Sequence, residues 1–165
     1  MEKIISGLTG ETEAPARKQT AVGDGAASRL PSLPGFDMEG ALERLAGNTR
    51  LYAKTLCLFV GLAPRHAKGL EKALERQDLH NLHREVHTIK GLAATIGAYE
   101  LHSESTSVEH LIKTGQITPE GGQQGVNRVT SLLARLSDAI KLSGICSEYG
   151  FSDLLAGPPD GSTQE

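Results

Sequence analysis

The sequence predicts an all-α fold, an antiparallel four-helix bundle with a short capping helix at its N-terminal end and flexible tails. Apolar residues recur at steps of three and four along four long segments, which is the period of a helical face turned toward a core. No segment alternates apolar and polar residues as a half-buried strand does. Four amphipathic helices joined by short connections close a core most simply as an antiparallel bundle.

Composition and charge narrow the class of protein. The 165 residues suit one domain with flexible ends, and with 4% aromatic residues and no Trp its core must be aliphatic. The net charge of −3 gives no electrostatic reason to expect a nucleic acid partner. No run of eighteen apolar residues and no signal-peptide pattern are present, so we expect a cytoplasmic segment that does not insert into a membrane.

The two cysteines are far apart and follow no pattern. Cys57 and Cys146 fit a reducing cytosol, and we expect neither a disulfide framework nor a zinc ribbon. Cys57 is expected to be a small buried apolar residue, and Cys146 has no partner motif.

The chain divides into a tail, a folded domain and a second tail. Residues 1–35 are rich in Gly, Ala, Ser, Thr and Pro and are expected to form a flexible linker. Residues 36–143 carry the helical periodicity. Residues 144–165 are expected to be mostly flexible, apart from one apolar patch that we expect to fold back on the bundle: Tyr149, Phe151, Leu154 and Leu155.

The first half of the domain contains the capping helix and one long helix. Asp37 is a suitable N-cap for a short amphipathic helix over Met38–Leu45. A second helix is expected to begin at Asn48–Thr49 and to end near Gln77-Asp78. Pro64 lacks a backbone donor, so it should kink this helix or split it in two.

Three further helices complete the prediction. Leu79–Gly97 has a helical apolar face, with Gly97 as a left-handed C-cap. A fourth helix is expected over Tyr99–Lys113. The segment Thr114–Gln124, which contains Pro119 and the pair Gly121-Gly122, is interpreted as a loop. The last helix carries five apolar residues at steps of three and four and ends at Gly144: Val126, Val129, Leu133, Leu136 and Ile140.

The third long segment also carries the candidate chemistry. His87 follows the buried-face residue Val86, so it lies about 100° round the helix from the apolar face. Its own face holds an ammonium and two very small side chains, although glycine inside a helix costs roughly 1 kcal/mol relative to alanine. We therefore expect a flat surface on which another protein docks, formed by neighbours one or two turns away: His83, Arg84, Lys90, Gly91 and Ala94.

A histidine in this setting can accept a phosphoryl group. Its neutral ring nitrogen is nucleophilic near pH 7, and Lys90 at i+3 can pair with phosphoryl oxygens. The sequence contains no Gly-rich phosphate loop, no Asp/Asn set for magnesium and no nucleotide motif. We therefore expect no cofactor and no kinase activity of its own, only a phosphoryl group that another protein delivers and removes.

Two alternatives remain open from these residues. His80, His83 and His87 share a broad helical face, and the i, i+4 spacing of the last two is one that zinc sites use, with His102 or His110 as further ligands. No HExxH frame supports this alternative. The second alternative is a helical interaction bundle without chemistry.

The stretch from His87 to Ala98 (HTIKGLAATIGA) resembles the signature of histidine-containing phosphotransfer (HPt) domains, which is His-x-x-Lys-Gly followed by small residues and a glycine. Leu101 and the pair Val108-Glu109 stand where that family has a leucine and a Leu-Glu-like pair. The resemblance covers about residues 33–142. Leu92 and Thr95 depart from it, which affects packing and partner preference. The His-Glu-x-x-Thr/Asn-Pro box of histidine-kinase dimerisation helices is absent.

The resemblance implies a module of a multistep His–Asp phosphorelay, as at the C-terminal end of hybrid sensor kinases. His87 would accept a phosphoryl group from a receiver-domain aspartate and pass it to another receiver, with Lys90 as charge partner. Mg²⁺ is expected on the receiver, and the domain is expected to be monomeric. The linker at residues 1–35 favours a piece of a hybrid kinase, at the cytoplasmic end of a membrane-anchored protein. Glu109 is expected at a helix surface or packing edge, not as an acid catalyst.

Overall fold

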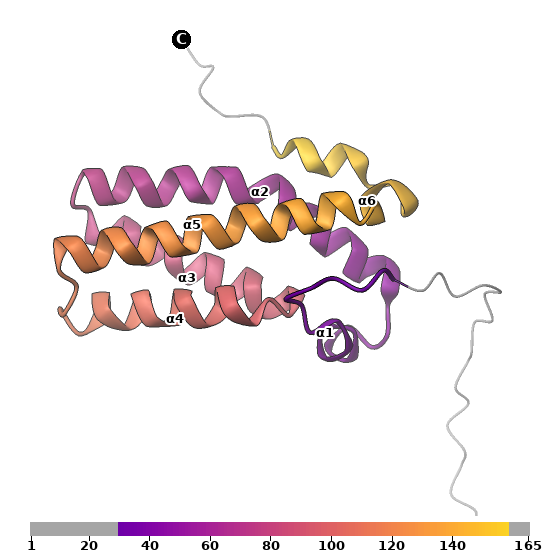
Figure 1. Ribbon diagram of the computed structural model, residues 1–165, viewed down its shortest axis with the longest axis horizontal. Coiled ribbons are helices and arrows are strands. Elements are labelled where there is room, and N and C mark those ends of the chain that lie inside the picture. The colour runs from indigo at the N-terminus through magenta and orange to yellow at the C-terminus, as the bar shows by residue number, and fades with distance from the viewer. Residues whose placement is uncertain (1–29, 159–165) are drawn as a thin grey trace, which may run out of the picture.

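A computed structural model describes residues 30–158, and every regular element within this range is a helix (Figure 1). Four long helices lie side by side: α2 (Thr49–Glu75), α3 (Leu79–Ile96), α4 (Tyr99–Lys113) and α5 (Pro119–Leu142). The short α1 (Met38–Arg44) crosses one end of them. The predicted all-α bundle is therefore confirmed. Most of the expected N-terminal linker and the end of the chain lie outside the described residues.

Side-chain caps fix where the helices begin. Asp37, Asn48, Asp78 and Thr118 each accept a hydrogen bond from the backbone N–H three residues later. At the other end of α3, Gly97 adopts φ +77 as the sequence predicts. Its carbonyl accepts from Asp37 N at 2.8 Å, and a Cβ at this position would lie 2.3 Å from Asp37 O. This glycine therefore lets the start of α1 pack against the end of α3.

The core is aliphatic and is drawn from all four long helices. Tyr52 and Phe59 are its large aromatic residues, and the Tyr52 hydroxyl donates to Ile96 O at 2.9 Å. The expected apolar face of α3 is buried from Leu82 onward. Leu79 is an exception, with 47% of its surface exposed, because it is the first residue of the helix and lies past the end of the packed layer.

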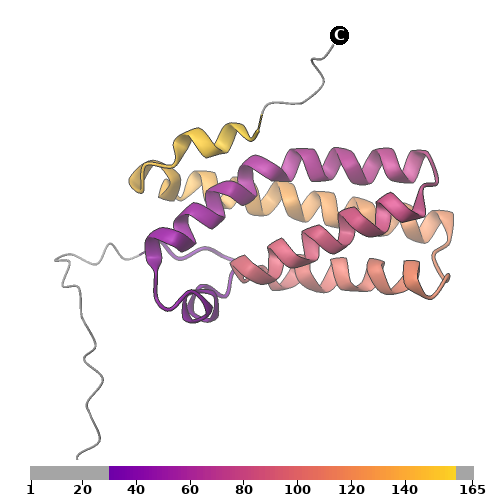
Figure 2. The same ribbon diagram turned by 180° about the vertical axis from the view of Figure 1, so that it is seen from behind.

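The sequence prediction for Pro64 and for the start of the last helix can be compared with the structure, and the second differs from it. At Pro64 the sequence predicts a kink or a split, and the structure shows the kink: helix α2 continues through Pro64 as one helix, and Figure 2 shows it changing direction near its middle. Helix α5 begins at Pro119, so most of the expected loop is helical. Proline is favoured in a first helical turn, where its missing N–H has no partner to lose. Gly125 then allows close packing of α4, since a Cβ there would lie 2.7 Å from Val108 Cγ2.

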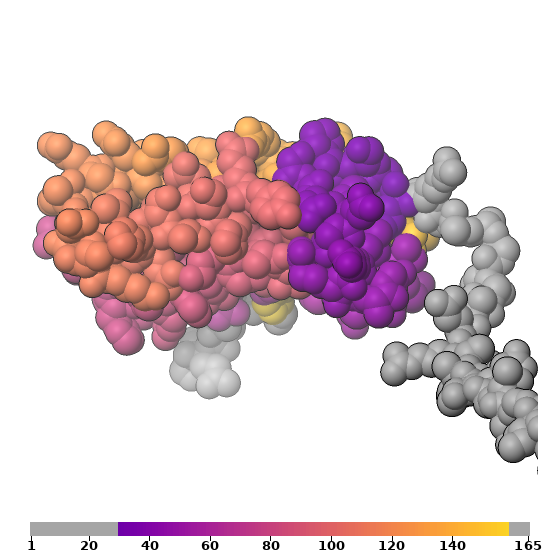
Figure 3. All heavy atoms as spheres, turned by 90° about the horizontal axis from the view of Figure 1, so that it is seen from below, coloured from indigo at the N-terminus to yellow at the C-terminus, as the bar shows by residue number. Residues whose placement is uncertain are grey.

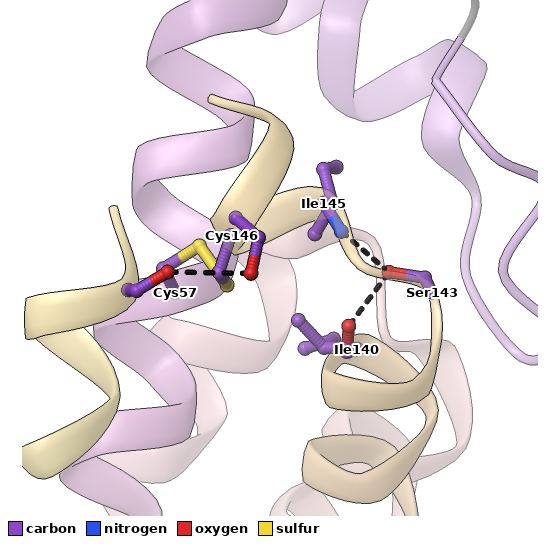
Figure 4. The surroundings of a disulfide bond; sticks show 7 residues. Cys57, Ile140, Ser143, Ile145 and Cys146 are labelled. Carbon is purple, nitrogen blue, oxygen red and sulfur yellow. Dashed lines mark hydrogen bonds between the residues drawn. A yellow bond between two sulfur atoms is a disulfide. The ribbon is translucent and has the colours of Figure 1, made fainter. Parts of the chain in front are cut away.

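A disulfide joins α2 to the C-terminal part of the chain, contrary to the sequence prediction. Cys57 and Cys146 are both buried and bonded to each other, 89 residues apart. Figure 4 shows the bond beside the turn in which the Ser143 hydroxyl donates to Ile140 O at 2.6 Å. Sequence spacing could not reveal this pair, because only the reversal of the chain after α5 brings Cys146 back to α2.

The segment after residue 143 is folded up to the end of the described range, which corrects the expectation of a mostly flexible tail there. It forms α6 (Ile145–Glu148) and the 3₁₀ helix η1 (Ser152–Ala156), and both pack on α2. The predicted fold-back of the apolar patch is confirmed, since all four of its side chains lie against the core. The Arg50 guanidinium also lies 4.9 Å above the Phe151 ring.

The face opposite this segment contains α3 and α4. Figure 3 views the molecule from the α4 side, where α1 and the residues before it cover one end and α4 runs across the middle. Among the described helices, none combines the length and hydropathy needed to cross a bilayer.

Candidate functional site

Helix α3 presents His87 to solvent beside a buried seam. Its neighbours Val86 and Ile89 are fully buried, and they fix the rotation of the helix. The His87 side chain is 62% exposed as a result. Position along the apolar period therefore places the imidazole at the edge of the interface between α3 and α4, as the sequence predicts.

Glu109 of α4 lies under this imidazole. Its side chain is only 5% exposed, and its Oε1 accepts from His87 Nδ1 at 2.7 Å. Lys90 Nζ donates to the other oxygen, Oε2, and Lys113 Nζ lies 3.0 Å from Oε1. We call these four residues, together with His83, the Glu109 cluster.

The cations of the cluster keep the Glu109 carboxyl ionised. The hydrogen bond from Lys90 is the largest cause, and those from His87 and Lys113 add to it. Burial acts in the opposite direction, because it disfavours the charged form. Together they lower the pKa of Glu109 from 4.5 to about 2. At neutral pH this nearly buried carboxylate is charged and fully paired.

The charge of Glu109 determines which nitrogen of His87 holds the proton. An ionised carboxylate only accepts hydrogen bonds, so in the pair at 2.7 Å the His87 Nδ1 must be the donor. In a neutral imidazole with Nδ1–H, the lone pair is on Nε2. The residue therefore presents a nucleophilic nitrogen on its exposed side.

The other predicted site residues lie in two groups. Arg84, Gly91 and Ala94 are on the open surface of α3 around His87. A Cβ added at Gly91 would meet nothing within 4 Å, so packing within the described residues does not require glycine there. Arg44 of α1 reaches the same surface, and its Nη2 donates to Ala94 O at 3.0 Å.

His83 is turned inward instead. Its side chain is 34% exposed, and its Nε2 lies 3.4 Å from Glu109 Oε1. The two histidine rings are stacked with centroids 6.1 Å apart and planes 26° apart. Of the residues expected to form the docking surface, His83 therefore belongs to the Glu109 cluster and not to the open face.

Glu109 is expected from the sequence at a helix surface or a packing edge, and the structure places it at the packing edge between α3 and α4, nearly buried and with cationic partners that the sequence did not assign to it. A signal was present in the sequence. Glu109 adjoins Val108 and precedes Ile112 by three residues, so the helical period places it beside the apolar face of this segment. A carboxylate at such a position needs cationic partners, and His87 and Lys90 were already identified.

The histidines of the metal-site alternative are not gathered into a single site within the described residues. Within residues 30–158, no group of three or more His, Cys, Asp or Glu side chains is arranged to hold a metal ion. His80 and His110 are exposed residues outside the Glu109 cluster. The metal-site alternative is therefore not favoured.

Comparisons with known proteins agree with this geometry. The family model described as "Hpt domain" matches residues 54–139, which include all of α3 and α4. A solved HPt domain from a sensor hybrid histidine kinase of Shewanella is similar to the chain with a TM-score of 0.61 and 16% identity. That similarity covers 69% of this chain and 95% of the other, and at this identity it shows the fold alone. No curated protein matches the chain.

Proposed function

The chain belongs to the Hpt domain family and is a histidine phosphotransfer module of a His–Asp phosphorelay, within which we propose that His87 Nε2 is the atom that carries the phosphoryl group. The observation that carries this proposal is the 2.7 Å hydrogen bond from His87 Nδ1 to the nearly buried Glu109. It fixes the ring so that the free lone pair faces solvent.

In the proposed step, the Nε2 lone pair attacks the phosphorus of an aspartyl phosphate on a receiver domain. The N–P bond forms while the P–O bond to the aspartate breaks, and the aspartate leaves as a carboxylate. No proton has to move, because His87 keeps its Nδ1–H. The ring becomes an imidazolium, and Glu109 Oε1 neutralises that charge from a distance already set in the unphosphorylated protein. Transfer to the next receiver is the reverse of this step.

Lys90 has two roles in the proposal. It is the main cause of the low pKa of Glu109, so it keeps the carboxylate charged beneath His87. It also lies one helical turn from His87, where an ammonium can pair with phosphoryl oxygens. We expect the loss of Lys90 to slow transfer without preventing it.

We propose that a receiver domain docks on the open face of α3. Arg84, Gly91 and Ala94 are exposed there, and the empty space above Gly91 admits the backbone of a partner. The receiver supplies the Mg²⁺ and the acidic pocket, and this chain supplies the histidine. We further propose that the domain acts as a monomer in the cytoplasm and binds no cofactor of its own.

The test is phosphoryl uptake from a receiver domain labelled on its aspartate. The wild-type chain should gain acid-labile, base-stable label, and His87→Gln should gain none. His80→Gln is the matched control, because it removes an exposed histidine of the same helix outside the Glu109 cluster. Equal labelling of His87→Gln and wild type would refute the assignment of His87.

A further inference from the structure

One buried polar atom of the Glu109 cluster, a ring nitrogen of His83, plays no part in the proposed transfer. His83 Nε2 is buried and makes no hydrogen bond within the described residues. Its nearest acidic atom is Glu109 Oε1 at 3.4 Å, the same oxygen that holds His87 Nδ1. A buried ring nitrogen without a partner costs free energy, so its position beside that oxygen calls for an explanation.

Both lone pairs of Glu109 Oε1 already have a hydrogen-bond donor. A carboxylate oxygen offers two lone pairs, and Oε1 accepts from His87 Nδ1 at 2.7 Å while Lys113 Nζ lies 3.0 Å away. His83 is therefore a third donor near an oxygen that can accept two hydrogen bonds. It can bond to Oε1 only when one of the other two donors leaves.

We infer that His83 is a positioning residue which, on taking up a proton, draws Glu109 Oε1 away from His87 and slows phosphoryl uptake in acid. The inference rests on the proposed role of His87. An imidazolium donates from both nitrogens, so a protonated His83 needs an acceptor at Nε2, and Oε1 is the nearest one. When His87 is the donor displaced, it loses the bond that holds its proton on Nδ1, and the tautomer with a blocked Nε2 becomes populated. Displacement of Lys113 instead would leave the pH profiles of wild type and variant parallel.

The charged groups around His83 support this sequence of events. From α4 it faces Glu109 and, through it, Lys113. On its own helix it faces His87, with Lys90 beyond, and the exposed His80 lies one turn before it. On the α2 side of α3, the pair His66–Glu85 joins the two helices at 2.8 Å. Glu85 lies two residues from His83, or about 200° round the helix, so this pair cannot serve His83.

Helix α1 contributes no competing charge. Its Arg44 contacts Ala94, eleven residues along α3 from His83, which corresponds to about 16 Å along the helix. Glu109 is therefore the acidic group that a proton on His83 would engage.

The experiment compares pH profiles of phosphoryl uptake between pH 8 and pH 5. His83→Phe keeps a stacked ring without nitrogens, and His83→Gln gives a second non-titrating variant. Every rate is divided by the wild-type rate with the same labelled receiver, which cancels the receiver's own response to pH. His80→Gln is the control, and it should follow the wild type at every pH.

The ratio of variant to wild-type rate at pH 8 is the reference with which the ratios in acid are compared. In acid the wild type is slowed by protonation at both His83 and His87, and the variants by protonation at His87 alone. The ratio of the His83→Phe rate to the wild-type rate should therefore rise as the pH falls, by at most about tenfold per pH unit. A ratio of variant to wild-type rate that stays constant with pH, or that falls in acid, would overturn the inference.

A measurement without phosphate separates this inference from the proposed function. In ¹⁵N spectra of the free protein, the His87 Nδ1–H signal should weaken on acidification in wild type and persist to lower pH in His83→Phe. Equal persistence in both proteins refutes the role of His83 even if His87 is labelled. A wild type that takes up no label at any pH refutes the proposed function, and the spectra still decide about His83.

Discussion

Gly61 of α2 and Leu154 of η1 meet backbone to backbone. A Cβ added at Gly61 would lie 2.1 Å from Leu154 O and 3.0 Å from Gly157 Cα. The glycine in the middle of a long helix is thus explained by the C-terminal segment that packs on it. Glycine at this position costs roughly 1 kcal/mol of helix propensity, which the packing of η1 must exceed.

Gly61→Ala should displace η1 from α2. The methyl group cannot fit against the Leu154 carbonyl, so we expect a loss of about 1–3 kcal/mol of stability and faster amide exchange at residues 152–157. Hydrogen exchange and urea unfolding measure both effects. Gly91→Ala is the control, because it makes the same change in an exposed helical position. Unchanged exchange at residues 152–157 in Gly61→Ala would contradict the prediction.

Reduction should destabilise the protein. Cys57 and Cys146 close a loop across 89 residues, so loss of their bond should cost about 2–4 kcal/mol. Urea unfolding with and without a dithiol reductant measures this cost in the wild type. The double variant Cys57→Ala/Cys146→Ala should be insensitive to reductant and as stable as reduced wild type, apart from the volume lost on truncation. Wild-type stability that ignores the reductant would show that the bond is absent in solution.

Stability should depend on Glu109 in acid. The pKa of this carboxyl is about 2 in the folded protein and near 4.5 when unfolded, so between these values the unfolded chain binds more protons. The contribution of Glu109 is complete above pH 4.5 and disappears as the pH falls toward 2. Glu109→Gln should thus be less stable than wild type by about 1–3 kcal/mol at pH 7 and similar to it near pH 2. Urea midpoints of both proteins between pH 2 and pH 7 test this prediction. A stability difference between Glu109→Gln and wild type that stays constant with pH would count against it.

Gly91→Ala should separate stability from function. Since a Cβ at Gly91 meets nothing, alanine should stabilise α3 by about 0.5–1 kcal/mol. The same methyl group enters the proposed docking face, and Gly91→Leu should slow transfer by about tenfold or more, equivalent to about 1.4 kcal/mol. Thermal unfolding and labelling rates measure the two effects. Ala134→Leu, an exposed change on α5, is the control; full activity of Gly91→Leu would argue against docking at this face.

The sequence predicted the helices better than the contacts between them. Periodicity along α3 placed His87 at the edge of the core, and capping chemistry placed the starts of α1 and α2 and the left-handed Gly97. These features depend on residues within one or two turns. The start of α5 was missed because Pro119, Gly121 and Gly122 were weighed as loop formers. In the structure Thr118 caps the helix that they begin, and a Cβ at Gly122 would lie 3.3 Å from Leu74 Cδ1 of α2.

The interactions that sequence reasoning missed all join distant parts of the chain. Glu109 and His87 are 22 residues apart and Cys57 and Cys146 are 89 apart, so no local period contains either pair. The inward position of Glu109 could be predicted from the phase of α4, but its partners depend on how α4 rotates against α3. The reversal after Ser143 likewise decides where Cys146 lies.

The single carboxylate of Glu109 also determines how substitutions in this protein combine. His87, Lys90 and Lys113 all draw on one charge, so removing one donor changes what each remaining donor contributes. Their mutational effects will therefore be non-additive, with coupling energies measurable in double-mutant cycles. A substitution at Lys113 that has little effect by itself would change how much a later substitution at Lys90 destabilises the site. The order in which such changes arise then limits which sequences this site can reach.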